Sequence, residues 1–378
     1  MQTRVAWVSC ILAGTLLQPM SAPQTPSPSA AQQRDGQHDW DTFFGTWKMR
    51  LRRRLRPLTG SNDWVEFEAH DSTRPVWGGR ANLDEFEADG PNGHIEGLTL
   101  RIYNPHTHQW NIHWANSTDP TPENPVIGEF KDGRGEFYDQ EMFNGRSIFV
   151  RFLWTNVSEA SGDFEQSFSD DGGRTWEPNW ITTMEREPAG RANIPPNPDK
   201  HDGQHDFDFE FGRWTVHLKR LAQPLSPSQQ WLVYKGTIVV TPLWNGRANI
   251  AELEAKNDTD RIEGLSLRLF DPHTHQWSLW WANATDGTLD TTPVVGSLEK
   301  GRGEFYAFEQ YAGRWVLVRF TFSDIRADSI HGEQAYSTDG GKTWAPNWIE
   351  DITRGDGNPS LSGANLPAKP RSFRHRQS

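Results

Sequence analysis

Residues 36–47 read GQHDWDTFFGTW, and the stretch returns at residues 203–214 as GQHDFDFEFGRW. The Trp that ends each copy is as far from its partner in sequence as Trp110 is from Trp277. A repeat of this length is a whole domain rather than a module of a solenoid. The sequence therefore predicts two homologous domains, at residues 36–187 and 203–354.

The segments outside the repeats have the composition of export and linker sequences. Residues 1–22 are predicted to be a signal peptide, with cleavage as late as residue 31, because Arg4 precedes an apolar stretch too short to span a bilayer. Pro-rich and polar composition predicts a disordered tether at 23–35, a linker at 188–202 and a disordered tail at 355–378. We expect a secreted or periplasmic protein without a transmembrane segment. The single cysteine, Cys10, falls in the predicted signal.

Within each repeat the apolar residues alternate as in β-strands. LTLRIY (98–103), WNIHWAN (110–116) and SIFVRFLW (147–154) each place apolar side chains on every second position. Turn residues such as GPNG, KDGRG and SDDGG separate these runs. About eight to ten strands per repeat close naturally into a barrel. The predicted fold is all-β, with two tandem antiparallel up-and-down β-barrels.

The stretches FFGTW (43–47) and FEFGRW (209–214) resemble the Gly-x-Trp opening strand of lipocalins and other calycins. That resemblance implies that a basic residue of the last strand packs across the Trp, and Arg186 and Arg354 stand where this residue is expected. The whole repeat resembles a lipocalin-like bacterial family of unknown function. The resemblance implies a fold and no established reaction.

Two charged or motif-like stretches have structural interpretations. SDDGGRTW (169–176) and STDGGKTW (337–344) match the Asp-box of sialidases, but the Asp-box is itself a hairpin staple, and a propeller would repeat it once per blade. In KMRLRRRLR (48–56) the basic residues alternate with apolar ones, which indicates a solvated outer face or a dock for an anionic partner. The formal net charge of −12 argues against a general nucleic-acid-binding protein.

The favoured function is binding of a small, largely apolar or aromatic molecule inside a barrel, since tryptophans supply flat apolar walls. The candidate ligand-binding residues are aromatic, amide and arginine side chains that both repeats share: Trp110, Trp114, Asn116, Arg80, Asn82 and Arg101 in the first, and Trp277, Trp281, Asn283, Arg247, Asn249 and Arg268 in the second. Arg80 and Asn82 are interpreted as part of a polar rim at a barrel mouth, although turn formation explains them as well.

Two further functions stay open. An enzyme acting inside the barrel, of isomerase, cyclase or hydrolase type, would use Glu165 or Glu333 as acid or base and Arg151 or Arg319 as anion stabiliser. The same pairs on the outer wall would be structural. The third function is a docking module with filled barrels.

No metal site and no cofactor are predicted. PHTHQW at 105–110 and 272–277 contains a His-x-His pair, but Pro and the preceding Asn or Asp place it in a hairpin turn. His38 and His205 precede the first strand of each repeat, where a His–Asp hydrogen bond explains them.

Overall fold

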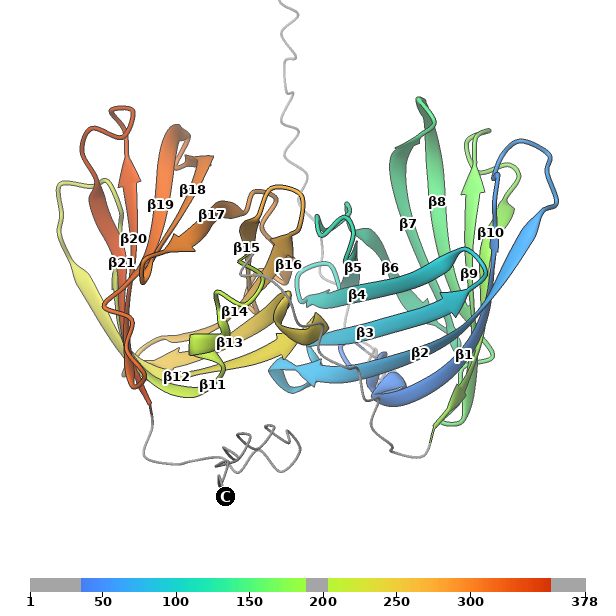
Figure 1. Ribbon diagram of the computed structural model, residues 1–378, viewed down its shortest axis with the longest axis horizontal. Coiled ribbons are helices and arrows are strands. Elements are labelled where there is room, and N and C mark those ends of the chain that lie inside the picture. Colours follow the sequence, from blue (N-terminus) through green and yellow to red (C-terminus); the bar gives the residue numbers. More distant parts are fainter. Residues whose placement is uncertain (1–34, 188–202, 355–378) are drawn as a thin grey trace, which may run out of the picture. The chain divides into compact units, whose positions relative to one another are not determined.

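The computed structural model describes residues 35–187 and 203–354, which form two β-barrels (Figure 1). The predicted signal peptide, linker and tail, and all of the tether but Asp35, lie outside the described residues. In the first barrel each strand pairs with the next along the chain, and β1 pairs with β10 to close the sheet. Its strands are β1 (Gly45–Arg54), β2 (Trp64–Val76), β3 (Ala81–Gly90), β4 (Gly93–Asn104), β5 (Gln109–Asn116), β6 (Val126–Lys131), β7 (Arg134–Phe143), β8 (Arg146–Thr155), β9 (Ser161–Ser169) and β10 (Glu177–Arg186).

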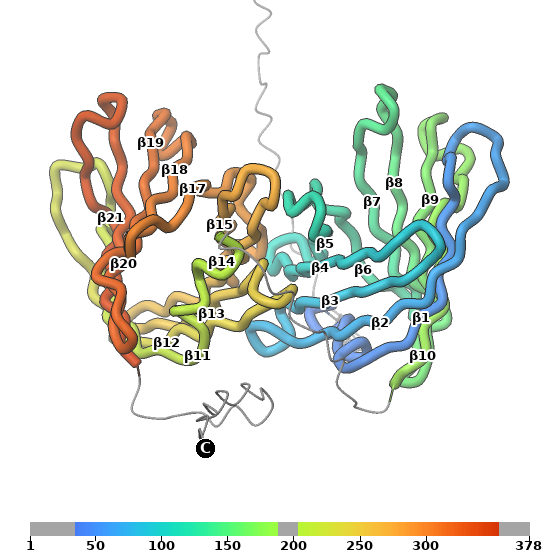
Figure 2. Tube along the Cα trace, in the orientation of Figure 1, coloured from blue at the N-terminus to red at the C-terminus, as the bar shows by residue number. Residues whose placement is uncertain are grey.

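The second barrel repeats this topology (Figure 2). Pairing of β14 with β15 and of β11 with β21 closes it, and the two-residue β16 is an addition beside β15. Its strands are β11 (Gly212–Leu221), β12 (Trp231–Leu243), β13 (Ala248–Lys256), β14 (Arg261–Asp271), β15 (Gln276–Asn283), β16 (Thr288–Leu289), β17 (Val294–Glu299), β18 (Arg302–Tyr311), β19 (Arg314–Ser323), β20 (Ser329–Ser337) and β21 (Ala345–Arg354). The prediction of two closed antiparallel up-and-down barrels is confirmed.

A short 3-10 helix precedes the first strand of each barrel and brings aromatic side chains to the barrel floor. These helices are η1 (Asp41–Phe43) and η3 (Asp208–Glu210), and η2 (Trp77–Gly79) and η4 (Trp244–Gly246) form the turns after β2 and β12. Trp40 and Phe207, each beside its helix, are almost fully buried. The chain before β1 therefore closes one end of the lumen.

The predicted arginine across the opening-strand tryptophan is present in both barrels. The Cζ atom of Arg186 lies 4.2 Å from the ring centroid of Trp47, and that of Arg354 lies 3.8 Å from Trp214. Arg186 also donates to the carbonyl oxygens of Phe44, at 2.7 Å, and Thr42. Each arginine thus ties the last strand to the segment that closes the barrel floor.

Strands β3 to β5 bury apolar side chains on the face that points away from the lumen. Their apolar outward residues, including Leu98 and Leu100, join one buried cluster with residues of the second barrel, among them Leu265 and Leu267. The two barrels belong to one compact unit. The alternate residues of β4, Thr99 and Arg101 among them, face the lumen, so the polar face of this strand points inward and its apolar face outward.

The predicted hairpins are confirmed. Asp171 Oδ1 accepts hydrogen bonds from the backbone N–H groups of Arg174 and Thr175, both at 3.0 Å, and Asp339 repeats the contact with Thr343 at 2.9 Å. Both Asp-boxes therefore staple a loop between two strands. Residues 105–108, which hold the His-x-His pair, form the turn between β4 and β5.

The basic strand keeps its predicted outer face as far as Arg52. Lys48, Arg50 and Arg52 are exposed and alternate with buried Trp47, Met49 and Leu51. Arg54 departs from the prediction, because it is only partly exposed and donates to the Pro178 carbonyl at 3.0 Å. Among the described residues, no helix combines the length and apolarity needed to span a membrane.

Candidate functional site

The first barrel encloses a cavity of about 570 Å³. That volume lies in the range of small-molecule sites, which is about 300–1,000 Å³. The cavity is lined by strands around the barrel, and its walls are rich in aromatic rings. These rings include Trp40, Phe43, Trp47, Phe86, Trp114, Phe152, Trp154, Phe164, Phe168 and Trp180.

Trp114 lines this cavity, and its ring lies over Gly97 of β4, which has no side chain. A Cβ atom added to Gly97 would lie 1.9 Å from the Trp114 ring. Trp114 also packs edge-on against Phe86, with ring centroids 5.8 Å apart. The second barrel repeats the device with Gly264 and Trp281, where the same distance is 2.2 Å.

A buried arginine lies at the floor of the first lumen. The Cζ atom of Arg101 is 4.3 Å from the ring centroid of Trp40, and Arg101 donates to Asn82 Oδ1 at 2.9 Å and to Asp84 Oδ2. Asp71 lies nearby and accepts a hydrogen bond from the Thr73 hydroxyl at 2.9 Å. Burial, reinforced by the charge of Asp84, raises the pKa of Asp71 well above its ordinary value. The lumen floor thus carries two acids against one arginine.

Three more carboxylates, Glu123, Asp139 and Glu141, line the same cavity farther from the floor. The loop between β5 and β6 carries Glu123, and its backbone N–H donates to the Trp114 carbonyl at 2.8 Å. Burial raises the pKa of Glu123 to about 7, and the charges of Glu141, Asp119 and Asp139 add to the shift. Burial also raises the pKa of Asp139 and of Glu141.

The second barrel holds a matching acidic pair. The backbone N–H of Asp290 donates to the Trp281 carbonyl at 2.8 Å, as that of Glu123 does to Trp114. Burial raises the pKa of Asp290 to about 6, with added effects of Glu309 and Asp286. Glu309 occupies the place of Glu141 in the corresponding strand hairpin and also has a raised pKa through burial.

The predicted residues of the first barrel separate into two groups. Trp114, Asn116 and Arg101 line the cavity. Trp110 is fully buried beneath it, where its Nε1 donates to the Gly36 carbonyl at 2.9 Å. Asn82 is also fully buried, and its Oδ1 accepts a hydrogen bond from Arg101.

In the second barrel the same positions have similar surroundings. Trp277 is buried, with its Nε1 donating to Gly203 at 2.9 Å, and Trp281 packs against Trp348 at 5.9 Å between ring centroids. Asn283 Oδ1 accepts the backbone N–H of Thr285 at 3.0 Å and so holds a turn. Two further predicted residues are buried at the floor, namely Asn249 and Arg268.

Arg80 and Arg247 have carboxylate partners that sequence reasoning did not find. Arg80 pairs with Glu263 at 2.8 Å, and Arg247 pairs with Glu96 at 2.6 Å. Arg80 is equivalent to Arg247, and Glu96 is equivalent to Glu263. Each repeat therefore supplies the arginine of one ion pair and the glutamate of the other. Arg80 and Arg247 directly follow η2 and η4 on the floor side of each barrel, where turn formation explains them; their role in ligand binding stays a prediction.

The candidate catalytic pairs lie on the outer walls. Arg151 alternates along β8 with Val150 and Phe152, which line the cavity, so its side chain points away from it. It donates to Glu165 at 3.3 Å. Arg319 and Glu333 form the same outer pair at 3.6 Å. Arg151 therefore lies outside the cavity, a position that does not favour the predicted acid–base role of the Arg151–Glu165 pair; that role stays a prediction for Glu165 and Glu333.

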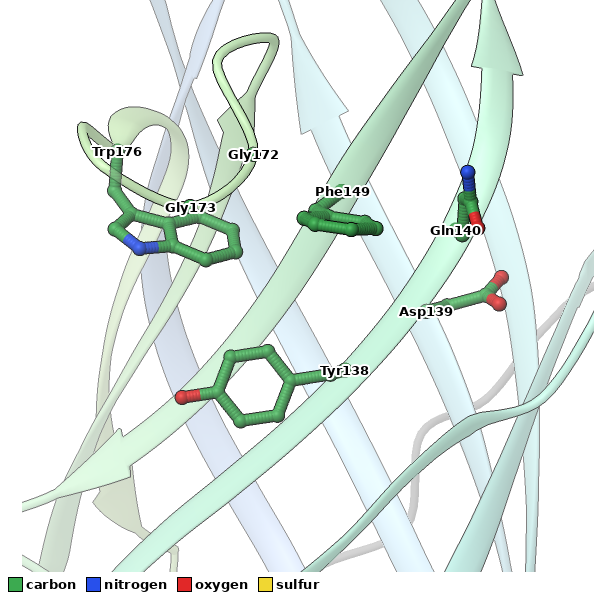
Figure 3. A pocket seen from close by; sticks show the side chains of 7 residues that line it. All are labelled: Tyr138, Asp139, Gln140, Phe149, Gly172, Gly173 and Trp176. Carbon is green, nitrogen blue, oxygen red and sulfur yellow. The ribbon is translucent and has the colours of Figure 1, made fainter.

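A second, open hollow of about 440 Å³ lies on the outside of the first barrel. Figure 3 shows Tyr138, Phe149 and Trp176 around it, beside the Asp-box loop that carries Gly172 and Gly173. Arg151 lies against the Trp176 ring, 4.7 Å from its centroid. This hollow is shallow and exposed, and the aromatic faces around it also hold the Asp-box loop in place.

Sequence reasoning missed Glu123, Asp139 and Glu141. Glu141 had a readable signal, because RGEFYDQEMF and RGEFYAFEQY keep an acid at the same position. Among the described residues, no group of three or more His, Cys, Asp or Glu side chains is arranged to hold a metal ion.

Comparison with known proteins adds little to this picture. The BNR/Asp-box repeat model matches residues 335–346, which include the whole of the second Asp-box. No curated protein matches the chain.

Several solved structures are similar over one or both barrels. The S-type phycobiliprotein lyase CPES from Guillardia theta has 10% identity and a TM-score of 0.29, over 40% of this chain and 92% of the lyase. A protein of unknown function from the DUF3598 family of Nostoc punctiforme has 10% identity and a TM-score of 0.26, over 85% of this chain and 100% of its own. A de novo designed fluorescence-activating β-barrel has 13% identity and a TM-score of 0.23, over 40% of this chain and 98% of its own.

Proposed function

We propose that the protein binds a small, aromatic-bearing molecule in the lumen of its first barrel. The observation that carries this proposal is the cavity of about 570 Å³ with Trp114, Trp154 and Trp180 in its walls. Aromatic rings in a concave, water-poor site give a flat ligand a large buried area. The ligand enters from the end opposite the floor, because the segment with Trp40 and Phe43 closes the other end.

The geometry favours binding over catalysis. The pair that the sequence suggested for acid–base chemistry, Arg151 with Glu165, faces away from the lumen. A docking module with filled barrels is also less favoured, since the first lumen contains open volume beside its aromatic side chains.

Nile red, a neutral dye whose emission shifts to the blue in apolar surroundings, tests the proposal. We expect saturable binding to the full mature chain and displacement of the dye by small aromatic molecules. Trp114→Ala removes a wall of the cavity and should weaken dye binding at least about tenfold. Trp315→Ala is the matched control, because Trp315 is exposed on the second barrel.

Native mass spectrometry and an absorption spectrum of protein purified from its own host identify the physiological ligand. Protein that carries no small molecule and gives no saturable Nile red signal would overturn the proposal. Dye binding that Trp114→Ala leaves unchanged would locate the site elsewhere.

Membership of the lipocalin-like bacterial family and export by the segment at residues 1–22 belong to the same proposal. An exported carrier meets its ligand outside the cytoplasm. Amino-terminal sequencing of the protein recovered from periplasm or medium should give a first residue between 23 and 32.

A further inference from the structure

We propose that the ligand of the first lumen is an organic cation, an aromatic molecule with a protonated amine that lies among Glu123, Asp139 and Glu141. This inference rests on the proposed function and deepens it by naming the chemical class. A purely apolar carrier needs no carboxylates in its cavity, because burying them without partners costs free energy.

The charges that line the cavity are unequal. Six acidic residues reach it, namely Asp71, Asp84, Glu96, Glu123, Asp139 and Glu141, against the basic residues Arg53, Arg54, His94 and Arg101. Most of the basic groups have partners of their own, because Arg101 holds Asp84, His94 pairs with Asp89 at 2.8 Å, and Arg54 donates to carbonyl oxygens.

Arg53 lies at the open end of β1 and is exposed, and Glu96 pairs with Arg247. No basic side chain among the described residues forms an ion pair with Glu123, Asp139 or Glu141. These three carboxylates therefore stand as like charges, with Asp139 and Glu141 half-buried and Glu123 more exposed. A bound cation would relieve both their repulsion and their lost hydration.

A second observation points to a ligand that donates hydrogen bonds. Asp84 is 5% exposed and lines the cavity, and its Oδ1 atom has no hydrogen-bond partner, while Oδ2 accepts from Arg101. A buried carboxylate oxygen without a donor is costly. A hydrogen-bond donor on the part of the ligand that reaches toward the floor would satisfy it.

The acids at the level of Trp114 are kept in both barrels although their surroundings differ. Glu123 and Glu141 correspond to Asp290 and Glu309, and each loop acid is held by the same backbone contact to a lumen tryptophan. Asp139, by contrast, becomes Ala307. Two acids and an aromatic wall are thus the shared core of the arrangement, and aromatic faces attract cations as well as apolar groups.

Three indoles of similar shape and different charge test the inference on the full mature chain: tryptamine, a cation, tryptophol, which is neutral, and indole-3-acetate, an anion. Titration calorimetry at pH 8 and displacement of Nile red measure their affinities. We expect tryptamine to bind at least about tenfold more tightly than tryptophol, and indole-3-acetate to bind most weakly.

The carboxylates are then neutralised. Glu123→Gln with Glu141→Gln should remove the preference for tryptamine and leave tryptophol affinity within about twofold. A companion variant with Asp290→Asn and Glu309→Gln added removes any contribution of the second barrel. Glu129→Gln is the matched control, because Glu129 lies on the outer wall beside Lys131.

The outcomes separate the two proposals. If Nile red binds and tryptophol displaces it as well as tryptamine does, the lumen is a carrier site and the cation inference is wrong. Equal tryptamine affinity in the wild type and the Glu123→Gln, Glu141→Gln variant also overturns it. If neither dye nor indole binds, both proposals fail.

Discussion

The two barrels keep an arginine inside the lumen but take its counter-charges from different elements. In the first barrel Arg101 lies between two acids on β2 and β3, Asp71 and Asp84. In the second, Arg268 pairs with Glu210 of η3, and the buried Glu350 of β21 lies within their field. Burial raises the pKa of Glu350 to about 7.

The two barrels place their acids at different positions: two positions are acidic only in the first barrel, and two others only in the second. Where one barrel has an acid, the other has an apolar or neutral residue, so that Asp71, Asp84, Phe43 and Thr182 correspond to Ile238, Ala251, Glu210 and Glu350. Each lumen nevertheless keeps two acids around one arginine. The arginine keeps its position in both barrels, whereas its acidic neighbours come from different elements of the barrel.

The exchange changes the space as well as the charge. In the first barrel the carboxylates on β2 and β3 line an open cavity. In the second barrel Glu210, from the floor segment, accepts a hydrogen bond from Arg268. The Cζ atom of Arg268 also lies 4.9 Å from the centroid of the Phe207 ring. Moving the acids to the floor segment thus puts charge where the first barrel has Phe43. This difference makes the first lumen the better candidate for a ligand.

The largest expected effect comes from transplanting one arrangement into the other. Glu210→Phe restores the residue of the first barrel but leaves Arg268 buried without its partner, and it should cost about 3–5 kcal/mol of stability. Adding Ala251→Asp supplies an acid at the position of Asp84 and should recover most of that loss. Urea unfolding followed by circular dichroism measures both variants.

The matched control is Glu254→Gln, on an exposed part of β13. A loss below about 1 kcal/mol for Glu210→Phe would show that the pair carries little of the second barrel's stability. A double variant no more stable than the single one would mean that the acid positions are not interchangeable.

The second expected effect is a pH-dependent contribution of the loop acids Glu123 and Asp290 to the stability of the protein. Because burial raises the pKa of Glu123 to about 7 and that of Asp290 to about 6, the folded chain holds these protons more tightly than the unfolded chain does. Their stabilising contribution is present in acid and is lost as the pH rises through 6 in the second barrel and through 7 in the first.

Glu123→Gln should therefore raise the free energy of unfolding at pH 8, by no more than about 1 kcal/mol because Glu123 is exposed and its charge is screened by solvent, and leave it nearly unchanged at pH 4. Asp290→Asn should give a gain that is complete about one pH unit lower. Unfolding midpoints in urea between pH 4 and pH 9 test both variants, with Glu129→Gln as the surface control. A gain for Glu123→Gln that is equal at pH 4 and pH 8 would contradict the assignment.

Much of the fold could be predicted because its signals are local. The repeated Gly-x-Trp stretch, the arginine at the end of each repeat and the Asp-box turns each specify a short piece of backbone, and the structure has all of them. The alternation along β4 and β5 also gave the two faces of each strand correctly. Period-two patterns carry that information without any tertiary contact.

The assignment of those faces to lumen or exterior could not be read from one strand. Leu98 and Leu100 look like lumen residues, but they face outward and are buried in a cluster shared with the second barrel. The same contact supplies Glu263 to Arg80, which sequence reasoning placed at a rim. A strand buried on both faces does not reveal which side is the cavity.

The loop acid Glu123 was missed for a different reason. A one-residue insertion in the second repeat follows it, so aligning the Pro-Val pairs after the loops, at residues 125–126 and 293–294, sets Glu123 against Thr291 rather than Asp290. Only the matching backbone contacts to Trp114 and Trp281 reveal the equivalence. Loop residues that reach a cavity by folding back leave no periodic pattern in the sequence.

The smallest expected effect concerns the Asp-boxes, in which the two barrels are alike. Hydrogen bonds from the backbone and hydroxyl of Thr175 hold the pKa of Asp171 at about 2, and those from Thr343 do the same for Asp339. The stabilising contribution of a lowered pKa is present above about pH 4 and is lost as the pH falls through 2. Asp171→Ala and Asp339→Ala should therefore speed amide hydrogen exchange at Thr175 and Thr343 by similar factors at pH 7, with little change in the urea midpoint. A strong effect in one barrel and none in the other would mean that the loops differ as the lumens do, and that the shared scaffold extends only to the strands.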